Sequence, residues 1–298
     1  MTYHNPVLLK ESVEGLRIDP EGVYADLTFG GGGHSREILE RLSGGRLIAF
    51  DQDPQAAENS IDDTRFTFVN GNFRYLTQFL RYHNALPVDG ILADLGVSSH
   101  QIDSAQRGFS TRSDAPLDMR MDTELPQSAA TLLQSVQEDE LEAILRNYGE
   151  VSGSRRVARA IISFRDRYSI DTTFKLKEAV SSFVPARFEN KFMAKLFQAI
   201  RIAVNDEIAA LREMLLQCHD VLKPGGRLVV ISYHSIEDRL VKHFMRTGNF
   251  EDRKETDFFG KSNTPFRVIT RKAVTPSQDE LAVNSRARSA RLRIGEKL

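Results

Sequence analysis

A run of four glycines, Gly30 to Gly33, constrains the fold more than any other feature of the sequence. Val23 to Ala25 lead into it as an apolar, partly β-branched stretch, and Ile38 and Leu39 follow it at helical spacing. Such a junction is expected where the first parallel strand of an α/β sheet turns sharply into the first helix. Because glycines have no Cβ, they can take positive φ and expose N–H groups to a polar ligand. The loop therefore predicts a ligand site at the carboxyl edge of a parallel sheet.

Two ligand classes use a loop of this kind: dinucleotides and S-adenosylmethionine. The spacing here is Gly30-x-Gly32-x-x-Ser35, so the third glycine of the dinucleotide fingerprint is absent. Asp26 lies four residues before Gly30, and the spacing Asp-x-x-x-Gly-x-Gly resembles the first motif of class I methyltransferases. A carboxylate there can orient the ammonium group of S-adenosylmethionine, which a dinucleotide lacks. On this stretch alone, a glycine-rich turn without any ligand remains the alternative.

Size and composition limit the remaining classes of protein. A chain of 298 residues can form one large α/β domain with an insertion, or two domains, without a structural metal. Cys218 is the single cysteine, which excludes an intramolecular disulfide and a cysteine-based zinc site and fits a reducing compartment. No apolar run approaches the ~18 residues of a membrane span, and the amino terminus lacks a signal pattern. We therefore expect a cytoplasmic protein without a membrane segment or a metal.

Aspartates close two further predicted strands. Asp51 ends the stretch 46–51, about twenty residues after the glycine loop, where an acid can accept hydrogen bonds from ribose hydroxyls. Both cofactor classes contain that ribose, so Asp51 supports the site without choosing the cofactor, and a solvated acid is the alternative. Asp94 ends the apolar stretch 88–94. Since open α/β sheets bind ligands at the carboxyl ends of their strands, Asp94 is also expected at the site.

The position of Asp94 suggests chemistry on an exocyclic base amine. In methyltransferases that act on such amines, the motif at this place begins with Asp, Asn or Ser and continues with two prolines and an aromatic residue. The amine is a poor nucleophile because its lone pair is delocalised, and acceptors on its two hydrogens favour the pyramidal nitrogen needed for attack. Asp94 and the carbonyl of Leu95 can supply these acceptors. The prolines and the aromatic residue are absent here, which leaves Phe29, Phe109 and Tyr233 as candidates for a stacking ring.

The middle of the chain changes character. Residues 105–190 contain several segments with helical spacing, and a long amphipathic pattern over 192–215 predicts one helix returning to the sheet. We therefore expect a sheet domain over 1–104 and 191–298, with a helical insertion over 105–190. Arg155, Arg156 and Arg159 in this insertion face either phosphate or solvent.

The carboxyl-terminal part adds a histidine and a basic stretch. His234 directly follows the predicted strand 227–232 and can accept a proton, bind a phosphate or orient a base. Beyond it, a set of basic residues faces few acids, and we leave open whether it contacts phosphate or solvent. The set comprises Arg267, Arg271, Lys272, Arg286, Arg288, Arg291 and Arg293. The net charge of −1 says little about nucleic-acid binding by the whole chain.

Seven motifs in order along nearly the whole chain closely resemble those of the bacterial 16S ribosomal RNA cytosine-N4 methyltransferase family. They are Thr28–Ser35, Phe50–Pro54, Asp94–Ser99, Asp118–Asp122, Phe197–Arg201, Tyr233–Arg239 and Arg286–Ser289. The resemblance implies methyl transfer from S-adenosylmethionine to the exocyclic N4 amine of a cytosine in the decoding region of 16S rRNA, near the P site. It also implies a Rossmann-like class I methyltransferase sheet, mostly parallel with helices on both faces. The inserted all-helical domain would then recognise the RNA substrate.

The resemblance also implies residue roles. The cofactor-binding residues would be Gly32, Gly33, His34, Asp51, Phe73, Asp94 and Gln101. We add Asp26 to this set on the chemical argument above, and we assign catalytic roles on the base side to Asp94 and His234.

The expected partner is 16S rRNA within the small ribosomal subunit, and the protein is expected to be a monomer or homodimer. Three alternatives stay open. The same fold can act on DNA or on a protein side chain, or the chain can be a non-catalytic RNA-binding module of ribosome assembly. A nicotinamide-dependent dehydrogenase fits less well, because Ser35 replaces the fingerprint glycine.

Overall fold

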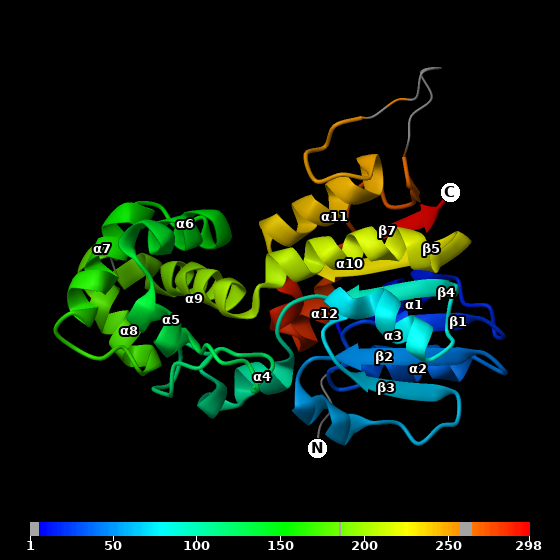
Figure 1. The fold of residues 1–298 in the computed structure, drawn as a ribbon, viewed down its shortest axis with the longest axis horizontal. Coiled ribbons are helices and arrows are strands. Elements are labelled where there is room, and N and C mark those ends of the chain that lie inside the picture. The colour runs from blue at the N-terminus through cyan, green and yellow to red at the C-terminus, as the bar shows by residue number, and fades with distance from the viewer. Residues whose placement is uncertain (1–5, 185, 255, 257–263) are drawn as a thin grey trace. The chain divides into compact units, whose positions relative to one another are not determined.

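A computed structural model describes residues 6–184, 186–254, 256 and 264–298. Within these residues, seven strands form one sheet in the order β3-β2-β1-β4-β5-β7-β6 (Figure 1). The first five strands pair in parallel, whereas β7 runs antiparallel to both of its neighbours. This order, with one reversed strand, is that of a class I methyltransferase, and it confirms the predicted fold class. The strands are β1 (Val23–Asp26), β2 (Arg46–Asp51), β3 (Phe66–Asn70), β4 (Val88–Asp94), β5 (Leu222–Ser232), β6 (Phe266–Val268) and β7 (Arg291–Lys297).

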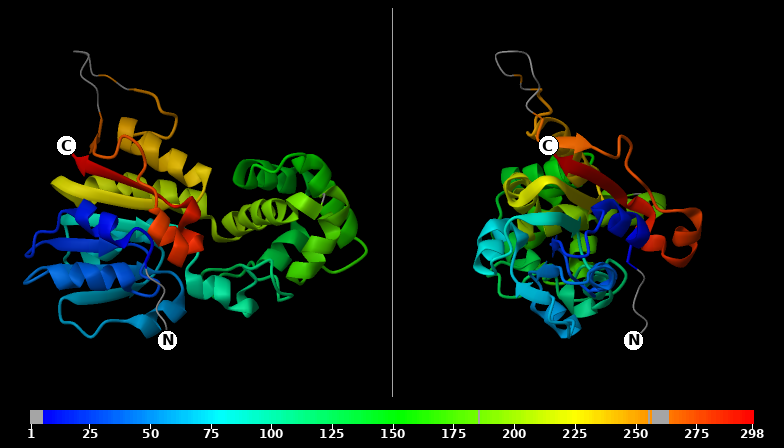
Figure 2. Two further views of the ribbon diagram at one scale, coloured as in Figure 1. Left: turned by 180° about the vertical axis from the view of Figure 1, so that it is seen from behind. Right: turned by 90° about the vertical axis from the view of Figure 1, so that its right-hand side faces the viewer.

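Helices cover both faces of this sheet (Figures 1 and 2). One face packs against α3 (Leu76–Tyr82), α10 (Glu207–Val221) and α11 (Ser235–Thr247). The other packs against α1 (Leu9–Leu16), α2 (Gly33–Arg41) and the segment that contains α12 (Gln278–Val283). Successive strand residues alternate between the faces: Ile91 belongs to the first core and Leu92 to the second. Because both faces are buried, the central strands are apolar throughout.

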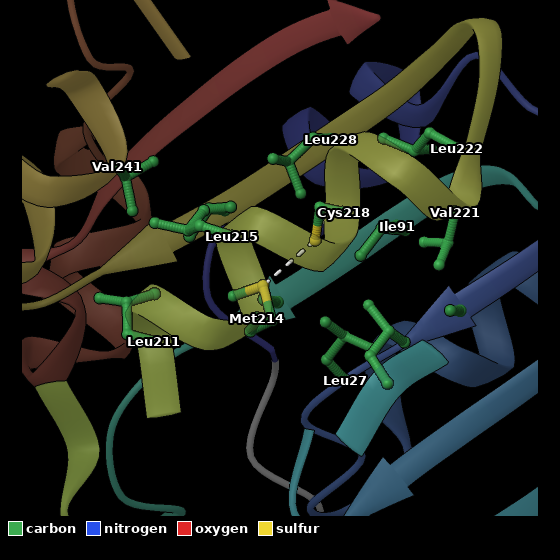
Figure 3. Packing of buried hydrophobic residues seen from close by; sticks show 14 of the residues in the cluster. Leu27, Ile91, Leu211, Met214, Leu215, Cys218, Val221, Leu222, Leu228 and Val241 are labelled. Atoms are coloured by element: carbon green, nitrogen blue, oxygen red, sulfur yellow. Dashed lines mark hydrogen bonds between the residues drawn. The ribbon is translucent and has the colours of Figure 1, made fainter. Parts of the chain in front are cut away.

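The first of these cores is built around α10 (Figure 3). Leu211, Leu215 and Cys218 point from this helix into the cluster, and the Cys218 thiol donates a hydrogen bond to Met214 Sδ at 3.2 Å. Burial raises the pKa of the Cys218 thiol far above its ordinary value, so it stays protonated. The single cysteine therefore acts as a small apolar filler of the core.

The chain divides into two compact units: residues 1–96 with 208–298, and residues 97–207. The second unit is helical and has its own core, in which α6 packs against α7 and α9. It therefore extends beyond the expected insertion at both ends. Its helices are α4 (Ser99–Asp103), α5 (Ala129–Ser135), α6 (Glu138–Gly149), α7 (Ser154–Arg165), α8 (Thr173–Val180) and α9 (Glu189–Asn205).

The single long helix predicted over 192–215 is wrong. Asp206 adopts a left-handed conformation with φ of 50°, which ends α9 before α10 begins at Glu207. The two halves bury their apolar residues in different cores, with Ile200 in the helical unit and Leu211 in the sheet unit. Apolar periodicity continues across the break, so the sequence pattern does not reveal it.

Several arginines of the basic carboxyl-terminal set are already paired. Arg293 is buried and donates to both carboxylate oxygens of Asp238, at 2.6 and 3.0 Å, and Arg291 donates to the same group at 3.2 Å. Burial alone would raise the pKa of Asp238, but its bonds with the two arginines outweigh that effect and hold the pKa below its usual range. Arg267 pairs with Glu296. Arg291 and Arg293 therefore join β7 to α11, and Arg267 joins β6 to β7. These three arginines are not a row of unpaired charges for phosphate.

In the part of the chain that the structure describes, no helix is both long enough and apolar enough to cross a membrane.

Neighbouring leucines on α10 provide a matched test of the core. Leu215 is fully buried, whereas Leu216 is 52% exposed. We expect Leu215→Ala to lower the free energy of unfolding by about 3 kcal/mol, because it leaves a cavity in a closely packed cluster. Leu216→Ala should change it by less than about 0.5 kcal/mol. Urea unfolding followed by circular dichroism measures both, and similar losses for the two variants would contradict this packing.

Candidate active site

The glycine loop is shaped by contacts that leave no space for larger side chains. Gly32 has a φ of 76° and forms the N-cap of α2, and a Cβ on it would lie 2.9 Å from the Phe29 ring. A Cβ on Gly33 would lie 2.1 Å from Pro6 Cγ. The loop therefore brings backbone, without side chains, to the positive end of a helix.

Asp51 fastens this loop to the next strand. Its carboxylate accepts hydrogen bonds from Gly30 N at 2.7 Å and from Asp53 N at 2.9 Å. Burial raises the pKa of Asp51 to about 6, although both backbone bonds oppose that rise. Each carboxylate oxygen retains a second lone pair, so contact with a ribose hydroxyl stays a prediction that this geometry permits.

Asp26 lies beneath the loop and not at its surface. It is 1% exposed, and its two oxygens accept hydrogen bonds from the Ser35 hydroxyl at 2.6 Å and from Thr28 N at 3.1 Å. Burial raises the pKa of Asp26 to about 6. Ser35, at the position of the missing fingerprint glycine, therefore has a function: its hydroxyl joins α2 to the end of β1. Direct contact between Asp26 and a cofactor ammonium remains a prediction.

Asp94 is held in place by two neighbours. Its Oδ1 accepts a hydrogen bond from the Tyr233 hydroxyl at 2.9 Å, and its backbone N–H donates to Thr28 Oγ1 at 2.6 Å. Among the described residues, none donates a hydrogen bond to Oδ2, and the side chain is 22% exposed. Burial raises the pKa of Asp94 to about 7, against the lowering effect of the Tyr233 hydrogen bond. Asp94 thus presents one free carboxylate oxygen at the carboxyl end of β4.

His34 approaches that oxygen as a neutral ring. Its Nε2 lies 3.1 Å from the carbonyl oxygen of Val7, so Nε2 carries the proton and donates it. Its Nδ1 lies 3.9 Å from Asp94 Oδ2. Burial lowers the pKa of His34 to about 4, in spite of the bond to Val7. The ring therefore brings a lone pair, and no positive charge, toward Asp94.

His234 is placed at the start of a helix. Its Nδ1 accepts a hydrogen bond from Glu237 N at 3.4 Å, and the Glu237 carboxylate accepts from the backbone N–H groups of Tyr233 and His234 at 2.9 and 3.3 Å. Its Nε2 lies 3.1 Å from Glu237 Oε1. These contacts form a capping box at the N-terminus of α11. They give His234 a structural role that the sequence analysis missed, and its catalytic role stays a prediction.

The two remaining predicted cofactor residues lie in different units. Phe73 begins a 3₁₀ turn (Phe73–Tyr75) after β3 and is half-buried against the core of the sheet unit. Gln101 lies in α4 of the helical unit, where it is buried and closes a capping box with Ser98. The sheet unit therefore contains Asp26, the glycine loop, His34, Asp51, Phe73, Asp94 and His234.

The structure also separates the three candidates for a stacking ring. Phe29 is buried between Phe66 and Phe68, with ring centroids 5.4 and 5.3 Å away, so it is not available to a base. Phe109 is partly buried and packs against the core of the helical unit. Tyr233 uses its hydroxyl to bind Asp94. The sequence analysis missed this contact with Asp94. The one signal that could have found it is the position of Tyr233 directly after β5, because parallel strands end at the same edge of a sheet.

The donor set of this edge fits a cofactor that carries a ribose and an ammonium group. Three carboxylates end β1, β2 and β4, and a loop with no room for a side chain at Gly32 or Gly33 leads into the positive end of α2. Among the described residues, no cluster of three or more His, Cys, Asp or Glu side chains is arranged to hold a metal ion. Together with the strand order, this edge defines a class I methyltransferase, a class that takes its methyl group from S-adenosylmethionine.

Comparison with known proteins places the chain within that class. It belongs to the MraW methylase family, whose model matches residues 1–298. Ribosomal RNA small subunit methyltransferase H of Bacteroides thetaiotaomicron is 54% identical over 298 residues, covering 100% of this chain and 98% of the relative. The protein of the same name from Cytophaga hutchinsonii is 52% identical and covers 99% of each chain. That from Flavobacterium johnsoniae is 51% identical and covers 100% of this chain and 99% of its own.

Two glycines with similar backbones test the loop. Gly32 and Gly225 have φ values of 76° and 80°, but a Cβ on Gly225 would meet nothing within 4 Å. Alanine at either site should cost roughly 1–2 kcal/mol of stability, because both backbones are left-handed. We expect Gly32→Ala also to weaken S-adenosylmethionine binding at least tenfold, since its Cβ displaces the loop from Phe29. Isothermal titration calorimetry measures this, and equal affinities for the two variants would contradict the role of the loop.

Proposed function

We propose that this protein transfers a methyl group from S-adenosylmethionine to the exocyclic N4 amine of one cytosine in the decoding region, at the P site, of 16S rRNA in the small ribosomal subunit. Membership of the MraW methylase family and the names of its relatives support a small-subunit rRNA substrate. The observation that carries the amine chemistry is Asp94, which ends β4 with Oδ1 bound to Tyr233 and with no hydrogen-bond donor on Oδ2 among the described residues.

The sheet unit supplies all of the proposed cofactor-binding groups except Gln101, which lies in the helical unit. When bound, S-adenosylmethionine supplies an electrophilic methyl group on a sulfonium. We assign Asp51 to the ribose, and the backbone of Gly32 and Gly33 to the close approach along the loop. Asp26 holds that loop through Ser35 and Thr28, while His34, Phe73 and Gln101 complete the proposed set.

On the substrate side, Asp94 and the carbonyl of Leu95 accept the two hydrogens of the amine. Withdrawal of these hydrogens from the plane of the base favours a pyramidal nitrogen whose lone pair is free to attack. Asp94 is the first acceptor of the proton that the amine loses, and its raised pKa of about 7 suits that task at neutral pH. His234 is proposed to contact the base or its phosphate from the start of α11.

The helical unit is proposed to recognise the RNA. Arg155 and Arg156 are exposed in the first turn of α7, and among the described residues no carboxylate pairs with either of them. The Arg156 guanidinium lies 5.6 Å from the centre of the exposed Phe183 ring. Arg187 and Phe188 form a second such pair at 4.5 Å. Arginines beside exposed aromatic rings suit a nucleic acid, because they offer charge to phosphate and flat surfaces to bases.

The proposal includes a cytoplasmic location and a monomer or homodimer.

The proposed reaction is tested by incubating the protein with radiolabelled S-adenosylmethionine and small subunits from cells that lack this protein, with naked 16S rRNA, DNA and protein as parallel substrates. Mass spectrometry of the labelled nucleoside should give N4-methylcytidine at one decoding-region position. Label in DNA or protein alone would support the same fold with another acceptor. Cofactor binding without any label would favour a non-catalytic assembly module.

Two aspartates on β4 give a matched test of the chemistry. Asp94 and Asp89 lie near opposite ends of the strand and are 22% and 21% exposed. Asp94→Asn should lower kcat at least about a hundredfold, because the amide is a far weaker proton acceptor. Asp89→Asn disturbs the bonds to Val23 N and Lys223, away from the site, and should leave kcat within about twofold. Cofactor affinity is measured for both, and full turnover by Asp94→Asn would remove Asp94 from the mechanism.

Charge reversal in the helical unit tests the RNA surface. Arg156→Glu should weaken binding to the small subunit and make the dependence of log Kd on log salt shallower by about 1, as expected for one lost phosphate contact. Arg146→Glu is the control, since Arg146 is 60% exposed in the same unit but is paired with Glu142 at 3.1 Å. Filter binding at several salt concentrations measures both slopes. Equal changes in affinity and slope for the two variants would mean that binding depends on the net charge of the protein and not on the position of Arg156.

A further inference from the structure

The corner that follows β5 is fixed on three sides. The backbone N–H of Tyr233 donates to Glu237 Oε2 at 2.9 Å, and the capping box of α11 holds that carboxylate. The Tyr233 ring lies beside Gly96, where an added Cβ would be 3.7 Å from Tyr233 Cδ2. The hydroxyl donates to Asp94 Oδ1 at 2.9 Å. Tyr233 thus connects the start of α11 to the carboxylate at the end of β4.

The phenol controls which way the Asp94 carboxylate faces. The Asp94 backbone is held by Thr28, but rotation about the terminal side-chain bond of an aspartate is soft. The hydrogen bond from Tyr233 to Oδ1 is therefore the contact that fixes this rotation. It leaves Oδ2 without a hydrogen-bond donor among the described residues, 3.9 Å from His34 Nδ1. The pKa of Tyr233 is raised, first by burial and then by Asp94, so the phenol keeps its proton and remains a donor.

We propose that Tyr233 is a positioning residue for methyl transfer: it acts through Asp94, holding Oδ1 so that Oδ2 meets the incoming amine as an ionised acceptor. This inference rests on the proposed function and assigns to Tyr233 a task other than stacking on the base. Tyr233 itself forms and breaks no bond. The proton of the amine passes to Asp94, while the phenol proton stays on Tyr233.

The charges around Asp94 explain why a donor is needed there. Asp26 on β1 and Glu237 on α11 both disfavour a further negative charge on Asp94, and burial acts in the same direction. His34 on α2 faces Asp94 as a neutral ring and so does not offset them. The Tyr233 hydrogen bond opposes these effects and lowers the pKa of Asp94. Removal of the hydroxyl should therefore raise that pKa and reduce the ionised fraction at neutral pH.

Tyr233→Phe tests the inference, because it retains the ring beside Gly96 and removes the hydroxyl alone. We expect kcat to fall about ten- to a hundredfold, with cofactor affinity within about twofold of the wild type. Activity requires ionised Asp94, so it increases with pH through the pKa of that group. In the variant this increase should move to higher pH, and alkaline buffer should restore part of the lost rate.

Tyr24→Phe is the matched control. The Tyr24 oxygen accepts a hydrogen bond from Asp19 N at 2.7 Å in the same unit, at a buried position away from Asp94. Its loss should lower stability without moving the pH profile. A fall in kcat for Tyr233→Phe with an unshifted pH profile would mean that Tyr233 has a purely structural role, and it would overturn the inference.

Replacement of Tyr233 by 3-fluorotyrosine gives a second test that keeps the fold intact. The fluorinated phenol is a stronger donor, so the pH profile should shift to lower pH, opposite to Tyr233→Phe. Carbon-13 NMR of labelled aspartate carboxyls measures the pKa of Asp94 directly in each protein, without catalysis. If the wild type methylates no RNA, the proposed function fails, yet this titration still decides whether Tyr233 controls Asp94. An unchanged Asp94 pKa in both variants would overturn the inference.

Discussion

The binding edge of this sheet depends on carboxylates that accept hydrogen bonds while they are buried. Asp51 fastens the glycine loop through Gly30, and Asp26 fastens the first turn of α2, directly after the loop, through Ser35. Burial raises the pKa of both carboxyls to about 6, which means that the fold holds charge where it is costly. Since a lost partner would leave a buried acceptor unsatisfied, the loop has little freedom to move. A rigid loop presents its backbone to a ligand already in place.

Most of the sheet could be predicted from the sequence, because its strands are short, apolar and separated by glycine, aspartate or proline. The ends of β2 and β4 fall where the pattern placed them, at Asp51 and Asp94. The break at Asp206 could not be predicted, since apolar spacing is the same whether one core or two receive it. Helical periodicity shows that one face of a helix is buried, but it does not show which core that face packs against.

In the candidate site, too, some features could be predicted from the sequence and others could not. Residue type and position at a strand end were enough to gather Asp26, Asp51 and Asp94 at one edge. The partners of these groups were not predictable, because Ser35, Tyr233 and Thr28 reach them from separate elements. The sequence left open whether the carboxyl-terminal arginines contact phosphate or solvent, and for the same reason it could not show their carboxylate partners. Arg291 and Arg293 share one face of β7, and that face meets Asp238.

The position of β7 has a consequence for how the chain is made. This strand follows β6 in the sequence yet lies between β5 and β6, so β6 has no place in the sheet until β7 has been synthesised. The helical unit is complete at residue 207 and depends on contacts between nearby helices, which form quickly. On a translating ribosome the helical unit can therefore fold first. Asp238 has no Arg293 to pair with until β7 has been synthesised, so the methyltransferase sheet is completed last.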